Sequence, residues 1–87
     1  MSKYRSNGIR VVKFNIGDNN YDKTMIYYKN GKPKLERNYK NGNLEGNLIS
    51  YWENGSVHTR GQYKSNKRTG TWSTFDKKGK KVLSEKF

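Results

Sequence analysis

The 87-residue sequence contains no cysteine, which excludes a disulfide framework, a thiolate nucleophile and a thiolate metal site. It has no run approaching the about 18 apolar residues of a membrane span, and residues 1–8 lack the apolar stretch of a secretory signal. We therefore expect a cytoplasmic protein in a reducing compartment.

Aliphatic side chains are scarce. Alanine is absent, and the chain has only four leucines, four isoleucines, four valines and two methionines, whereas twelve residues are aromatic. A chain of this size forms at most one small domain, and so little aliphatic material predicts a thin core. Disorder is disfavoured, because disordered segments contain few aromatic and β-branched residues. We expect residues 1–87 to form a single domain with a flexible terminus over residues 1–8.

Acidic residues are heavily outnumbered. Seven aspartates and glutamates stand against nineteen lysines and arginines, which gives a formal net charge of +12. Such a charge attracts anionic surfaces. The leading candidate for a partner is therefore an anionic macromolecule rather than a small-molecule substrate.

The sequence repeats with a spacing of 24 residues. The stretches YYKNG at 27–31, YWENG at 51–55 and FDKKG at 75–79 share one register. The same spacing separates the aromatic residues Tyr39, Tyr63 and Phe87. This period predicts repeats at 27–50, 51–74 and 75–87, preceded by a degenerate half-unit at 9–26 with an insertion around residues 18–20.

Each unit is predicted to form two short strands, because aromatic and β-branched residues alternate with polar ones between glycine-containing turns. Asn-Gly pairs at 30–31, 41–42 and 54–55 supply the positive φ angles that two-residue hairpin turns require. We therefore expect an all-β fold, a single antiparallel β-meander of about seven short strands built from 24-residue hairpin repeats. The expected strands are 9–16, 21–29, 34–40, 47–53, 56–64, 70–76 and 81–87.

Alternation along the strands predicts which side chains are buried. Over 56–64, Val57 and Tyr63 share the apolar side, and His58 falls on the polar side as a solvated histidine. Over 47–53, large apolar residues point to both sides. One sheet cannot bury two apolar faces, so it curls, is covered by a terminus or presents an aromatic face to a partner.

The repeat resembles the MORN-repeat variant found in small bacterial antitoxin-like proteins, over about residues 24–87. Tyr27 and Tyr51 match the aromatic position of that pattern. The remaining matches are its second aromatic, at Tyr39 and Tyr63, and its turn glycine, at Gly31, Gly55 and Gly79. The chain departs from it where Ser65-Asn66 replaces an Asn-Gly pair and Asp76 replaces an aromatic residue. The resemblance implies an open β-meander that binds proteins or acidic lipids and performs no chemistry.

Patterns of catalytic and metal-binding residues are missing. His58 is the only histidine, the carboxylates are scattered among lysines, and the glycines follow the repeat instead of the spacing of a phosphate-binding loop. We expect no enzymatic activity, no cofactor and no metal.

Basic and aromatic residues are the candidate partner-binding residues. We expect the turns that carry them to line one edge of the sheet as a positive stripe, with Lys29, Lys32 and Lys34 at an equivalent turn. The alternative is a solubilising lysine fringe that blunts the sheet edges. The aromatic members are stacking platforms for single-stranded nucleic acid or, alternatively, core residues. The predicted site comprises Lys64, Lys67, Arg68, Lys77, Lys78, Lys80, Lys81, Tyr28, Trp52 and Trp72.

Three functions remain open from the sequence. In the first, the basic stripe docks on nucleic acid or on a nucleic-acid-handling enzyme and acts as an inhibitor or an antitoxin-type blocker, a role that the small size and the Lys- and Asn-rich composition suit in a phage or bacterial mobile element. The second is a protein–protein interaction module. The third is peripheral binding to an anionic membrane surface.

Overall fold

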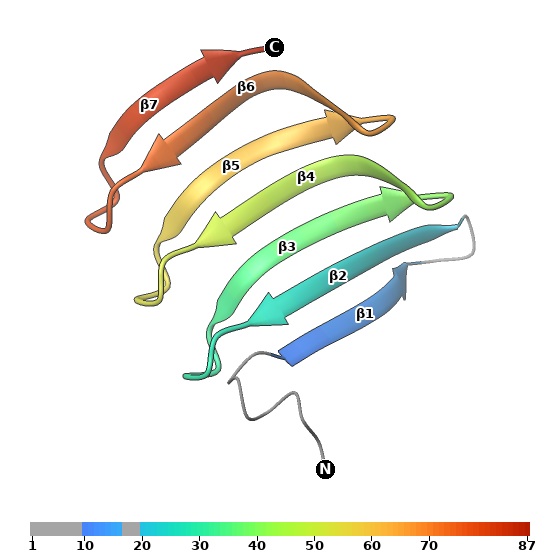
Figure 1. The fold of residues 1–87 in the computed structure, drawn as a ribbon, viewed down its shortest axis with the longest axis horizontal. Helices are drawn as coiled ribbons and strands as arrows, with labels where there is room; N and C mark the ends of the chain where they lie inside the picture. The colour runs from blue at the N-terminus through green and yellow to red at the C-terminus, as the bar shows by residue number, and fades with distance from the viewer. Residues whose placement is uncertain (1–9, 17–19) are drawn as a thin grey trace.

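The protein is a single open β-sheet. The computed structural model describes residues 10–16 and 20–87. Its seven strands lie side by side in chain order, each antiparallel to the next, which confirms the expected all-β meander (Figure 1). They are β1 (Arg10–Ile16), β2 (Tyr21–Tyr27), β3 (Pro33–Lys40), β4 (Asn43–Tyr51), β5 (Val57–Lys64), β6 (Lys67–Phe75) and β7 (Lys81–Lys86). The expected flexible terminus, the first residue of the expected strand 9–16, and positions 18 and 19 of the expected insertion lie outside the described residues.

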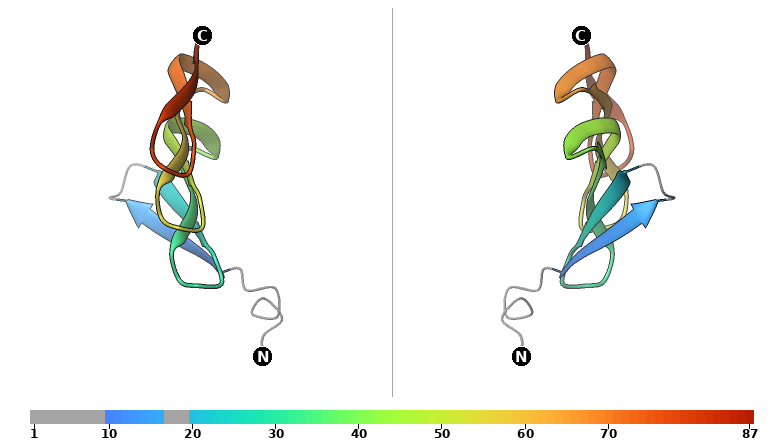
Figure 2. Two further views of the ribbon diagram at one scale, coloured as in Figure 1. Left: turned by 90° about the vertical axis from the view of Figure 1, so that its left-hand side faces the viewer. Right: turned by 90° about the vertical axis from the view of Figure 1, so that its right-hand side faces the viewer.

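The sheet is one layer thick. Its extents are 43 × 36 × 17 Å, and views along its edge show a twisted ribbon of strands (Figure 2). Within residues 20–87, no side chain is completely buried, and Trp72 is the only buried hydrophobic residue. The thin core expected from the composition is therefore a row of half-buried side chains.

Short turns join consecutive strands at one end of the strands, and we call this side of the sheet the short-turn edge. Residues 41–42 connect β3 to β4, and residues 65–66 connect β5 to β6. Both residues of each pair have positive φ, 52° and 84° at Asn41-Gly42 and 49° and 69° at Ser65-Asn66. Two positive φ angles define the type I′ hairpin turn. The replacement of Asn-Gly by Ser65-Asn66 therefore preserves the turn.

Longer turns join the strands at their opposite end, and we call this side of the sheet the long-turn edge. They comprise residues 28–32, 52–56 and 76–80. In the first, Gly31 N donates to Tyr28 O at 2.9 Å and only Gly31 has positive φ. A turn followed by a left-handed glycine makes a three-residue loop with a bulge. The two-residue turns expected at Asn30-Gly31 and Asn54-Gly55 are therefore wrong, because neither asparagine adopts positive φ.

Two strands begin earlier than expected. The predicted strands 47–53 and 70–76 are β4 from Asn43 and β6 from Lys67. The glycines Gly46 and Gly70, at φ 97° and 70°, lie inside these strands. Pairing jumps there: Arg37 lies opposite Leu48, whereas Tyr39 lies opposite Leu44. The glycines make bulges that change the direction of the strand without ending it. The predicted strand starts near Gly46 and Gly70 were therefore wrong.

One face of the sheet, the Trp72 face, holds the tightest packing. Its central row runs across the strands through Thr24, Arg37, Leu48 and Gly61. The Trp72 indole lies directly on Gly61, where it is 8% exposed. One repeat earlier, the equivalent pair is Arg37 and Leu48. A large residue thus faces a smaller one in both repeats, with the sizes exchanged between strands.

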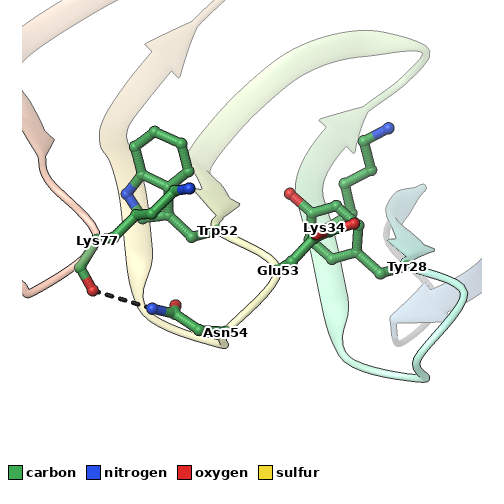
Figure 3. Close-up of a pocket in the computed structure, with 6 residues that line it drawn as sticks. All are labelled: Tyr28, Lys34, Trp52, Glu53, Asn54 and Lys77. Carbon is green, nitrogen blue, oxygen red and sulfur yellow. Dashed lines mark hydrogen bonds between the residues drawn. The ribbon is translucent and has the colours of Figure 1, made fainter.

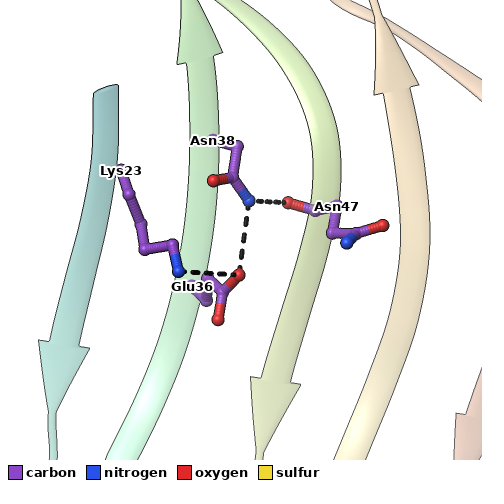
Figure 4. Close-up of polar contacts among 4 residues, drawn as sticks. All are labelled: Lys23, Glu36, Asn38 and Asn47. Carbon is purple, nitrogen blue, oxygen red and sulfur yellow. Dashed lines mark hydrogen bonds and ion pairs between the residues drawn. The ribbon is translucent and has the colours of Figure 1, made fainter. Parts of the chain in front are cut away.

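The opposite face, the Glu36 face, is organised around a polar cluster (Figure 4). Lys23 Nζ lies 3.8 Å from Glu36 Oε2. Asn38 Nδ2 donates to Glu36 Oε2 at 3.3 Å and to Asn47 O at 2.8 Å. Burial, and then the negative charge of Glu36, raise the pKa of Tyr51 above its ordinary value.

Candidate functional site

The basic clusters lie on two different edges of the sheet. Lys64, Lys67 and Arg68 flank the β5–β6 turn on the short-turn edge, whereas residues 77–81 lie in and directly after the β6–β7 turn on the long-turn edge (Figure 1). The single stripe expected from the sequence is wrong, because consecutive turns of a meander alternate between edges. The lysines that share the long-turn edge are Lys29, Lys32, Lys34, Lys77, Lys78, Lys80 and Lys81.

Asparagine side chains tie the long turns to one another. Asn30 Oδ1 accepts from Lys32 N at 2.9 Å within its own turn, and Asn30 Nδ2 donates to Glu53 O in the next turn at 3.0 Å. Asn54 repeats both contacts, with Ser56 N at 2.9 Å and Lys77 O at 3.0 Å. Each asparagine therefore closes its own loop and fixes the distance to the neighbouring loop.

Two aromatic residues are fixed in the same manner. Tyr28 Oη donates to Tyr51 O at 2.5 Å, and Trp52 Nε1 donates to Phe75 O at 3.0 Å. Both residues open a long turn, and both reach the last residue of a strand of the following hairpin. Their polar atoms are thus satisfied by the backbone, and their rings have defined positions.

An open groove of about 580 Å³ lies between these two aromatic residues (Figure 3). Lys34 Nζ lies 5.6 Å from the centroid of the Tyr28 ring, and Lys77 Nζ lies 5.5 Å from the centroid of the Trp52 ring. Both distances are within the range of cation–π attraction. Glu53 and Asn54 complete the lining. The groove therefore combines flat apolar surfaces with two cations.

His58 lines a second pocket, which shares Tyr28, Lys34 and Trp52 with this groove. It is not the solvated strand histidine that alternation predicted. Pairing shifts between Ser50 and Tyr51, so His58 is a bulged residue and turns towards Trp52. The two rings meet edge-on with centroids 4.3 Å apart. His58 Nδ1 also lies 2.6 Å from Thr59 Oγ1. The imidazole is half-buried and supports the indole.

Trp72 is not part of an accessible binding surface. It is buried on Gly61, and its ring has edge-on contacts with Tyr63 at 5.2 Å and Phe87 at 6.2 Å. The Arg68 guanidinium covers the cluster, 5.6 Å from the Trp72 ring and 4.4 Å from the Phe87 ring. Of the two roles considered for Trp72, the structure assigns it to the core, and Arg68 is engaged in covering it.

Three residues of this region were absent from the predicted site: Glu53, Asn54 and His58. Lys32 and Lys34 were expected at an equivalent turn of the stripe but were not named as partner-binding residues. Lys32 Nζ donates to Asn54 O at 3.3 Å, which brings it to the middle turn. The signal for Lys34 and His58 was their spacing of 24 residues, which places both at the bulge after a long turn.

Metal-binding clusters of histidine and carboxylate are absent from residues 20–87, whose side chains the structure describes. In the same described part of the chain, no helix is long and apolar enough to span a membrane.

The geometry is that of a repeated hairpin that builds a single-layer sheet. Comparison with known families agrees: residues 23–41 and 44–65 match the MORN repeat variant. Each match covers one hairpin with its long turn, β2–β3 and β4–β5. MORN repeats are generally interaction modules, so the match supports a binding role. No curated protein and no solved structure matches the chain significantly.

Proposed function

We propose that this is a non-enzymatic binding protein whose long-turn edge docks on nucleic acid. The observation that carries the proposal is the gathering of seven lysines on one edge, which also holds a groove with two fixed aromatic rings. Lysine ammonium groups recognise phosphates, and aromatic rings stack on bases. A protein that covers nucleic acid in this way blocks enzymes that act on it, which is the inhibitor or antitoxin-type role.

An acidic surface on a nucleic-acid-handling enzyme is the second candidate partner. The net charge of +12 supports it as well as it supports nucleic acid. The aromatic groove favours nucleic acid, because carboxylates on a protein surface neutralise lysines but offer no flat ring to Tyr28 and Trp52.

Two triple variants test the edge. Lys78, Lys80 and Lys81 on the long-turn edge are changed to glutamate, and the matched control changes Lys64, Lys67 and Lys86 at the opposite end of the strands. All six residues are exposed, and both variants lower the formal charge from +12 to +6, because each substitution replaces one positive charge by one negative charge.

Affinity for a labelled single-stranded RNA is measured by fluorescence anisotropy at constant salt. We expect the long-turn variant to lose at least about 100-fold in affinity, whereas the control loses less than about tenfold. Equal losses would show that net charge alone acts. Sedimentation with anionic vesicles together with indifference to RNA would contradict the proposal and favour a membrane surface.

A further inference from the structure

Lysines from two turns converge on the middle long turn. Lys32 comes from the first turn and donates to Asn54 O at 3.3 Å, and Lys77 comes from the third turn and lies over Trp52. The middle turn, residues 52–56, carries no lysine of its own and contributes only the carboxylate of Glu53. Three of the seven lysines of this edge, Lys32, Lys34 and Lys77, therefore lie at the groove or at the turn that lines it. A solubilising fringe requires no such convergence.

The two rings of the groove are organised before any ligand arrives. The hydrogen bonds from Tyr28 Oη and Trp52 Nε1 hold the rings against the following hairpin. Equivalent positions two strands apart are separated by about 10 Å, whereas stacked bases are about 3.4 Å apart. The groove between the rings therefore has room for a planar group against either ring.

We propose that the groove is a subsite for an unpaired base of a single-stranded nucleic acid. The base stacks on Trp52, and the flanking phosphates pair with Lys77 and Lys34. This inference rests on the proposed docking of the long-turn edge and specifies the form of nucleic acid that docks. A duplex does not fit the subsite, because its bases are stacked inside the helix and must be extruded to meet a pocket.

The lysines that cover the rings exchange partners on binding. In the unbound protein, the Lys34 and Lys77 ammonium groups lie 5.6 and 5.5 Å from the ring centroids. Phosphate oxygens are stronger partners for an ammonium group than a ring face. When the ammonium groups move to phosphates, the ring faces become free for the base. An acidic peptide would draw the lysines away and leave both rings uncovered.

The test compares two single-stranded probes in order to distinguish the contribution of the bases to binding from that of the phosphates. One is a labelled 12-mer of thymidylate, and the other is an abasic 12-mer with the same number of phosphates. We expect the base-bearing probe to bind the wild-type protein about tenfold more tightly, from the stacking of one base. It should also quench tryptophan fluorescence, whereas the abasic probe should not.

The substitution Trp52→Leu should remove both the affinity difference and the quenching. Tyr21→Leu is the matched control, because Tyr21 also carries a lysine over its ring, Lys40 Nζ at 5.3 Å, but lies at the short-turn end of β2. The control should retain the difference. Far-UV circular dichroism checks that each variant is folded, and the fluorescence of the wild-type protein decides the question if Trp52→Leu does not fold.

The outcomes separate this inference from the proposed function. Equal, salt-dependent binding of both probes to the wild-type protein would overturn the base subsite and leave the docking of the edge on nucleic acid intact. Failure of both probes to bind would overturn both. Displacement of the thymidylate probe by an equal concentration of a 12-residue polyglutamate would also overturn the subsite, because an acidic peptide would then satisfy the groove as well as a base does.

Discussion

The contact between Trp72 and Gly61 gives the sharpest prediction about the fold. A Cβ atom at Gly61 would lie against Cδ2 and Cε2 of the indole and 2.6 Å from its Cε3. Carbon atoms in favourable contact are about 3.5–4.0 Å apart, so the ring has to move by about 1 Å or more. Gly61 has an ordinary backbone conformation, since it is not among the residues with positive φ. Gly61→Ala therefore tests the contact with the indole without the strain of an alanine at positive φ.

The magnitude follows from the area that the ring loses. If the indole lifts from the sheet, it exposes about half of its roughly 200 Å² of surface. At about 25 cal/mol per Å², the free energy of unfolding then falls by about 2.5 kcal/mol. Alanine also restricts the unfolded chain, which returns at most about 1 kcal/mol. We expect a net loss of about 2 kcal/mol, or a melting temperature lower by about 10 °C.

A double-mutant cycle isolates the contact. Trp72→Leu places at position 72 the residue that occupies the equivalent position 48 one repeat earlier. Leu48 lies opposite Arg37, so a leucine at this position leaves room for a side chain on the neighbouring strand. Gly61→Ala should then change stability by less than about 0.5 kcal/mol, so the coupling energy is about 2 kcal/mol. Urea denaturation of the four proteins measures it. An equal effect of Gly61→Ala in both backgrounds would refute the steric argument.

Two further predictions concern the turns and the Glu36 face. Asn54→Ala removes the hydrogen bonds to Ser56 N and Lys77 O. Because these bonds are solvent-exposed, the free energy of unfolding measured by urea denaturation should fall by only about 1 kcal/mol. No change would mean that Asn54 does not couple the turns. The raised pKa of Tyr51 means that its neutral phenol contributes stability that is fully present below the unfolded value of about 10 and is lost as pH rises through the folded value. Tyr51→Phe should therefore lose less of its urea midpoint between about pH 9 and pH 11 than the wild type does, and an equal loss would contradict the assigned cause.

The repeat made the fold predictable from the sequence. Aromatic and turn residues at a spacing of 24 force the same hairpin to recur, and short turns leave only antiparallel neighbours. The first residues of β4 and β6 were harder to predict. Gly46 and Gly70 make bulges inside these strands, but in the sequence they resemble strand boundaries. Whether glycine ends a strand or bends it depends on the pairing of the neighbouring strand, which is a tertiary property.

The site was predicted only in part, for two physical reasons. Counting turns would have separated Lys64 from Lys77, since the turns at 65–66 and 76–80 are consecutive and so lie on opposite edges. Trp72 is equivalent to Leu48, which already pointed to the core, whereas Trp52 is equivalent to the groove residue Tyr28. The position of His58 was hidden by the bulge, which breaks the alternation on which the prediction relied.

The salt dependence of binding tests most directly the claim that the long-turn edge docks on nucleic acid. For the wild-type protein and a single-stranded oligonucleotide that contacts about six lysines, the log-log plot of affinity against salt should have a slope of about −4. Reversal of Lys78, Lys80 and Lys81 should reduce the slope to about −2, and reversal of Lys64, Lys67 and Lys86 should leave it near −4. A slope near zero for the wild type, or the same change in both variants, would contradict the assignment of the edge.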